Sequence, residues 1–224
     1  MKESRKRWKL WASLTCLVAL LALSSCKESD DSVDEFANWQ ETNENYFNNL
    51  YSQVTQKIAA GDTDWMILRK WSLEESIATR PENHIIVHVL EKGSGSGCPM
   101  FTDSVRVHYS GKLLPSASFP SGYTFDKSYY DTFDPATSRP STMCCSNLTD
   151  GFATAVMNMH IGDMWEIYVP HQLAYGKTGT TNSSGTQEIP GYSTLIFNVT
   201  LVSYYRTGAT PPPFQAKKNG GWIE

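Results

Sequence analysis

The sequence lacks the residue patterns of common metal-dependent and nucleophile-dependent enzymes. Its five histidines include no His-Glu-x-x-His spacing and its five cysteines no Cys-x-x-Cys pair, so a zinc site is not expected. A Gly-x-Ser-x-Gly turn and a phosphate-binding loop are also absent. These absences argue against a zinc enzyme, a hydrolase with a Gly-x-Ser-x-Gly nucleophile and a phosphate-loop enzyme.

The chain also lacks an apolar run long enough to span a membrane. The apolar stretch at 14–23 follows a basic stretch and is shorter than the roughly 20 residues of a spanning helix. Residues 1–25 are therefore predicted to be an export signal peptide. Its end, Leu23-Ser24-Ser25-Cys26, resembles the lipobox of bacterial lipoproteins, in which the cysteine becomes lipidated; the alternative is an ordinary signal peptide with a chance cysteine.

Basic residues are scarce outside this leader. The leader holds five of the 19 basic residues and one of the 23 acidic ones, so the remaining chain has a net charge of −8. An acidic protein is not expected to bind nucleic acid. Residues 26–35 are polar and acidic and are predicted to form a flexible tether from the membrane.

Three cysteines remain after the leader and the lipobox: Cys98, Cys144 and Cys145. An oxidising compartment would permit a disulfide from Cys98 to Cys144 or Cys145, and three buried thiols are the alternative.

Residues 36–80 are predicted to be an N-terminal helical segment. Apolar residues recur at three- and four-residue steps over 33–60, and Gly61 is placed to end that helix. The helix would either pack on the following domain or pair with a second copy as a dimerisation arm.

The remainder reads as a strand-rich domain with one short helix. Strands are predicted at 84–90, 104–109, 164–169 and 195–202, and a helix at 151–159. The order indicates an α+β fold with one helix against an antiparallel sheet. Residues 206–224, which include three consecutive prolines, are predicted to be a C-terminal tail.

Three segments carry a resemblance to a known family: Val105-Arg106-Val107-His108-Tyr109-Ser110-Gly111, Leu173-Ala174-Tyr175-Gly176 and Leu195-Ile196-Phe197-Asn198-Val199. In this order and spacing they resemble the FKBP-type peptidyl-prolyl cis-trans isomerases over residues 84–205. The resemblance implies an FKBP-like antiparallel sheet wrapped on one short helix, here preceded by an N-terminal helical extension. It implies no metal and no cofactor, and proline-containing polypeptides as clients.

The resemblance also assigns site residues. It implies that Asp126, Tyr175 and Phe125 are catalytic: Phe125 packs on proline, Asp126 sits beside the substrate amide, and Tyr175 donates its hydroxyl to a substrate carbonyl. The residues that it implies for substrate binding are Tyr109, Leu148, Thr149, Phe152, Ile189 and Phe197.

Several positions depart from the family pattern. Phe152 stands where the family has tryptophan, Thr149 where it prefers isoleucine, and the stretches at 112–125 and 177–186 are long. The leading hypothesis is an isomerase in the bacterial cell envelope, lipid-anchored through Cys26 at the outer membrane on its periplasmic or surface face. The alternatives are a non-catalytic FKBP-like binding module or chaperone, and a surface-exposed accessory lipoprotein.

Overall fold

The computed structural model describes residues 34–134, 137–185 and 187–213 of the 224-residue chain. The predicted signal peptide, Cys26, most of the tether and residues 214–224 of the tail lie outside the described residues. The helices are α2 (Trp39–Ala59) and α3 (Asp150–Val156). The strands are β1 (Trp65–Arg69), β2 (His84–Glu91), β3 (Ser104–Lys112), β4 (Thr124–Lys127), β5 (Ser141–Cys144), β6 (Met164–Val169), β7 (Thr180–Thr181), β8 (Gln187–Ile189) and β9 (Leu195–Tyr205).

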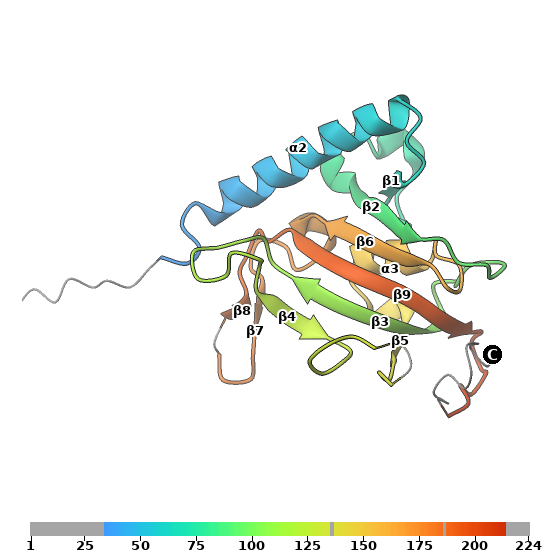
Figure 1. Ribbon diagram of the computed structural model, residues 1–224. Helices are drawn as coiled ribbons and strands as arrows, with labels where there is room; N and C mark the ends of the chain where they lie inside the picture. Colours follow the sequence, from blue (N-terminus) through green and yellow to red (C-terminus); the bar gives the residue numbers. More distant parts are fainter. Residues whose placement is uncertain (1–33, 135–136, 186, 214–224) are drawn as a thin grey trace, which may run out of the picture. The chain divides into compact units, whose positions relative to one another are not determined.

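Seven of the strands form one antiparallel sheet in the order β1-β2-β6-β9-β3-β4, with β5 also paired to β3 (Figure 1). Strands β7 and β8 form a separate hairpin. The long strand β9 lies in the middle, between β6 and β3. This arrangement confirms the predicted α+β fold with an antiparallel sheet.

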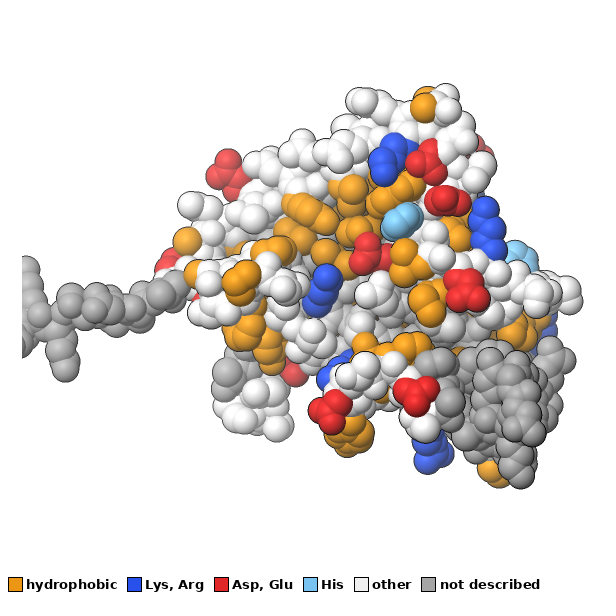
Figure 2. Space-filling model, in the orientation of Figure 1, with side chains coloured by type: hydrophobic (Ala, Val, Ile, Leu, Met, Phe, Trp, Pro, Cys, Tyr) orange, Lys and Arg blue, Asp and Glu red, His pale blue; other side chains and the backbone are white. Residues whose placement is uncertain are grey.

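The two helices cover opposite faces of the sheet. A Cβ on Gly151 of α3 would meet Ile85 and Val169, whereas Tyr51 and Tyr46 of α2 pack against His84 and Tyr168. Neighbouring residues of a strand point to opposite faces. The face under α3 is here termed the inner face and the face under α2 the outer face. Figure 2 shows hydrophobic side chains gathered where α2 meets the sheet.

Helix α2 is shorter than predicted. Residues 35–38 form a turn, and Asn38 has a left-handed φ of 52°, which interrupts the helical backbone just before Trp39. Its other end agrees with the prediction, because Gly61 adopts a left-handed φ of 92° directly after the last turn. Phe47 and Val54 are buried against the domain, so in this structure the helix packs on its own domain.

The segment predicted as helical over 36–80 is helical only in part. Residues 65–69 form strand β1, which pairs with β2 at the edge of the sheet. The run Trp65-Met66-Ile67-Leu68 has no helical period, and its bulky side chains fit a pleated surface. The predicted helix at 151–159 ends earlier, at Val156.

The cysteines Cys98, Cys144 and Cys145 are free thiols. The Cys98 sulfur lies 3.9 Å from His160 Nε2, and the Cys144 sulfur lies 3.1 Å from Ser146 Oγ. The alternative of three buried thiols holds for Cys145, whereas Cys98 and Cys144 are only half-buried.

Among the residues that the structure describes, no helix is both long and apolar enough to cross a membrane.

Candidate functional site

Four aromatic side chains from four different elements meet on the inner face of the sheet. Tyr109 of β3 packs edge-on against Phe152 of α3, with ring centroids 6.0 Å apart. Phe152 packs edge-on against Phe197 of β9 at 5.1 Å, and Phe197 against Phe125 of β4 at 5.6 Å. Edge-to-face packing is a favourable geometry for aromatic rings. We call these four residues the aromatic cluster; all four were predicted as site residues.

Gly111 of β3 allows two of these rings to approach. A Cβ at this position would lie 2.5 Å from Phe197 Cε1 and 2.6 Å from Phe125 Cζ. A side chain would therefore displace both rings. The sequence prediction did not include Gly111, although a glycine at an inward position of a strand is a signal for close approach by another group.

A hydrogen bond joins the aromatic cluster to a carboxylate. The Tyr109 hydroxyl donates to Asp126 Oδ2 at 2.6 Å, and Asp126 directly follows Phe125 on β4. Burial, and secondarily this hydrogen bond, raise the pKa of the Tyr109 hydroxyl, so it stays protonated at neutral pH. The bond fixes a charged group beside an otherwise apolar surface.

Tyr175 lies close to the same carboxylate. Burial raises the pKa of its hydroxyl, and the negative charges of Asp126 and Glu188 raise it further. The raised pKa keeps this hydroxyl protonated at neutral pH. Tyr175 is nevertheless 39% exposed, so a ligand can reach the residue. The negative charge of Asp126 therefore acts on the hydroxyls of both Tyr109 and Tyr175.

Three predicted residues remain: Leu148, Thr149 and Ile189. Thr149 precedes α3 in an extended conformation, and its carbonyl accepts the first helical hydrogen bond, from the Ala153 N–H at 2.9 Å. Leu148 is half-buried against the core, and Ile189 is buried at the end of β8. The core that includes Ile189 also includes Phe152 and Phe197.

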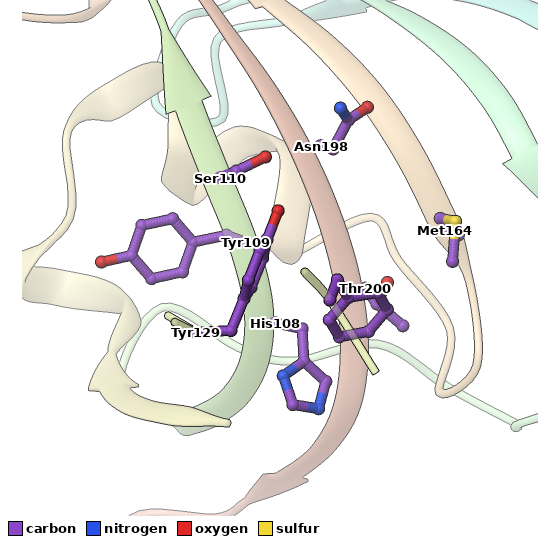
Figure 3. A pocket seen from close by; sticks show the side chains of 8 residues that line it. His108, Tyr109, Ser110, Tyr129, Met164, Asn198 and Thr200 are labelled. Atoms are coloured by element: carbon purple, nitrogen blue, oxygen red, sulfur yellow. The ribbon is translucent and has the colours of Figure 1, made fainter. Parts of the chain in front are cut away.

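A hollow lies on the outer face, and of the aromatic cluster only Tyr109 contributes to its lining (Figure 3). It has a volume of about 60 Å³ and is lined by His108, Tyr109, Ser110, Tyr129, Phe133, Met164, Asn198 and Thr200. His108 and Ser110 alternate with Tyr109 and Gly111 along β3, so their side chains point away from the aromatic cluster. Apart from Tyr109, no residue that lines this hollow was predicted as a site residue.

Comparison with known proteins gives one family. Residues 96–202 match the family described as FKBP-type peptidyl-prolyl cis-trans isomerase. The chain is 29% identical to "Macrophage infectivity potentiator" of Trypanosoma cruzi over 84% of this chain and 80% of that protein. It is 35% identical to "FKBP-type 22 kDa peptidyl-prolyl cis-trans isomerase" of Escherichia coli, over 54% of this chain and 50% of that protein.

A third relative carries a location in its name. The chain is 30% identical to "Outer membrane protein MIP" of Legionella longbeachae, over 51% of this chain and 42% of that protein. The chain therefore spans half or less of these two bacterial relatives. The crystal structure of FkpA from Escherichia coli aligns with a TM-score of 0.49 at 22% identity, over 75% of this chain and 62% of that one.

Proposed function

We propose that this chain, which belongs to the FKBP-type peptidyl-prolyl cis-trans isomerase family through residues 96–202, accelerates rotation about X–Pro bonds in polypeptide clients. The observation that carries the proposal is the Tyr109–Asp126 hydrogen bond at the edge of the aromatic cluster. It places an apolar surface and a fixed charge side by side, which suits a proline ring and its adjoining amide.

The chemistry required is the twisting of an amide. The planar amide faces a rotation barrier of about 18–20 kcal/mol, and uncatalysed X–Pro exchange takes tens to hundreds of seconds. When the amide twists, its resonance is lost and its carbonyl oxygen carries less negative charge. Apolar surroundings therefore disfavour the planar form more than the twisted form. No covalent intermediate is needed.

We assign the roles as follows. The proline ring packs on Phe125, Phe152 and Phe197, and Tyr109 lines the side of the same surface. Asp126 lies beside the substrate amide, and Tyr175 donates its hydroxyl to a substrate carbonyl. Fixed polar groups of this kind hold the substrate backbone while the amide turns. Leu148, the Thr149 main chain and Ile189 border the bound peptide.

The test is a protease-coupled isomerisation assay on the purified chain with Asp126→Val and Tyr175→Phe. A hydrogen bond to a charged group contributes about 1.5–3 kcal/mol, and each 1.4 kcal/mol is about tenfold in rate, so we expect losses in kcat/KM of about tenfold or more. Tyr130→Phe is the matched control, since Tyr130 is 95% exposed. A folded wild-type protein without activity would instead support the non-catalytic binding module.

We further propose that Cys26, which lies outside the described residues, anchors the chain to the bacterial cell envelope. The Leu23-Ser24-Ser25-Cys26 sequence and the outer-membrane relative support this location. Radiolabelled palmitate should label the wild-type chain and not Cys26→Ser, which should also leave the membrane fraction. Equal labelling of both proteins would refute the anchor.

A homodimer through α2 would have to use the polar side of the helix, since Trp39, Phe47 and Val54 are buried against the helix's own domain. Analytical ultracentrifugation of the wild-type chain decides between a monomer and this dimer.

A further inference from the structure

Helix α2 reaches the region of the site through a chain of buried hydrogen bonds. The indole N–H of Trp39 donates to Ser193 Oγ at 2.8 Å, and the same hydroxyl donates to the Pro190 carbonyl at 2.7 Å. Trp39 is 8% exposed and Ser193 is 3% exposed, so water does not compete for either bond. The helix is thereby tied to the residue that directly follows Ile189.

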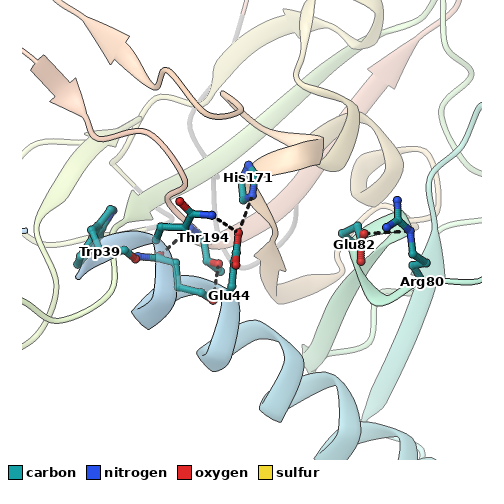
Figure 4. Close-up of polar contacts among 8 residues, drawn as sticks. Trp39, Glu44, Arg80, Glu82, His171 and Thr194 are labelled. Atoms are coloured by element: carbon teal, nitrogen blue, oxygen red, sulfur yellow. Dashed lines mark hydrogen bonds and ion pairs between the residues drawn. The ribbon is translucent and has the colours of Figure 1, made fainter.

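A second contact lies one turn further along the helix. Asn43 is fully buried, its Oδ1 accepts the Thr194 N–H at 2.7 Å, and its amide group donates to the Trp39 carbonyl at 2.7 Å. Figure 4 shows Trp39 and Thr194 in this contact region between α2 and the domain. A buried main-chain N–H without a partner is costly, so Asn43 fixes where Thr194 lies.

The segment held by α2, residues 190–194, joins two site residues. Ile189 precedes it, and Phe197 follows it on β9. The same segment also contacts the loop that follows Tyr175. The Tyr192 N–H donates to the Gly176 carbonyl at 2.9 Å, and a Cβ on Gly191 would lie 2.0 Å from the Lys177 carbonyl oxygen. The segment thus contacts both α2 and the loop that follows Tyr175.

We propose that α2 positions the isomerase site, with Trp39 and Asn43 as positioning residues that act through Ser193 and Thr194. The inference rests on the proposed isomerase function and adds that Trp39 and Asn43 of α2 determine how the site residues are placed. The hydrogen bonds of Trp39 and Asn43 are not needed merely to hold α2 on the domain, because Phe47 and Val54 already bury apolar surface there. Buried, fully paired polar groups instead specify one arrangement of the parts that they join. Small misplacements at a site cost activity, up to about 100-fold for 1 Å.

The experiment compares Asn43→Leu with Val54→Ala in the full chain. Asn43→Leu leaves the Thr194 N–H without its partner, whereas Val54→Ala weakens the packing of the same helix far from residues 190–194. Each variant is assayed with proline peptides at a temperature where circular dichroism shows it folded. Hydrogen exchange is measured in parallel over residues 187–197.

We expect Asn43→Leu to lower kcat by about tenfold and to speed exchange at Thr194, with the wild-type rate kept in Val54→Ala. Asn43→Asp, which keeps an acceptor for the Thr194 N–H, should retain more kcat than Asn43→Leu. Trp39→Phe and Ser193→Ala should each lower kcat, and the double variant should be no worse than the stronger single one, because both break one chain of bonds.

The outcomes separate the two proposals. An inactive wild-type protein overturns the isomerase function, and the exchange data then still show whether Asn43 orders residues 190–194. An active wild type with equal kcat in Asn43→Leu and Val54→Ala overturns the positioning role and leaves α2 as a stabilising element only.

Discussion

Substituting Gly111 by alanine tests whether the spacing of the aromatic cluster determines activity. The new Cβ would lie 2.5 Å from Phe197 Cε1, 2.6 Å from Phe125 Cζ and 2.8 Å from Phe197 Cδ1. Carbon atoms in ordinary contact are about 3.5–4.0 Å apart, so each ring has to move by roughly 1 Å. The backbone of Gly111 lies in a strand without a left-handed φ, so alanine strains only the packing.

Two magnitudes follow for Gly111→Ala. Overpacking of this kind costs about 1–3 kcal/mol in the free energy of unfolding, measured by urea denaturation. A displacement of about 1 Å in groups that contact the substrate lowers kcat/KM by up to about 100-fold, measured in the isomerisation assay. The loss of activity should therefore exceed what the unfolded fraction explains.

The control for Gly111→Ala is Gly61→Ala. Gly61 has a φ of 92° and open space around its Cα, so alanine there costs about 1–2 kcal/mol through left-handed strain alone. Gly61 follows α2, away from the aromatic cluster, and kcat/KM should remain at the wild-type value. Folded Gly111→Ala with wild-type kcat/KM would refute the role assigned to Phe125 and Phe197.

Three further predictions concern burial. Burial raises the pKa of the Cys145 thiol to about 11, so iodoacetamide at pH 8 should modify Cys145 only after denaturation, as read by mass spectrometry. Burial lowers the pKa of His171 in the folded protein, despite the nearby charge of Glu44. As the pH drops below about 6.5, the unfolded chain therefore binds a proton at this residue before the folded protein does, and the free energy of unfolding should fall. The urea midpoint of His171→Gln should depend less on pH over that range. Phe47 is 3% exposed, and Phe47→Ala should lower the free energy of unfolding by about 3–5 kcal/mol; a loss below 1 kcal/mol would contradict the packing of α2 on the domain.

The sequence predicted the regular elements where a side-chain pattern marks them. The apolar and aromatic residues at 164–169 and the branched residues at 84–90 predicted strands β6 and β2, because such side chains fit a pleated surface. Strand β1 was missed because Trp65-Met66-Ile67-Leu68 has neither a period of two nor a helical period. The strands Thr124–Lys127 and Ser141–Cys144 have only four residues each, too few to show a period, and both pair with β3.

The site residues came from the family resemblance, and the contacts between them came only from the structure. Tyr109 and Asp126 are far apart in sequence, and nothing in either local sequence states that their side chains form a hydrogen bond. The bond between Trp39 and Ser193 spans most of the chain and depends on how α2 lies on the sheet. The assigned roles of Leu148 and Thr149 in substrate binding stay predictions.

The central place of β9 determines when the sheet can be completed during synthesis. Strands β1, β2 and β6 lie on one side of β9, and β3, β4 and β5 lie on the other, so the two groups have no pairing until β9 is inserted. Tyr205 at the end of β9 pairs with Ser104, about 100 residues earlier in the chain. A nascent chain that has been extended only to residue 190 therefore holds two half-sheets with open edges, which are aggregation-prone until they are covered.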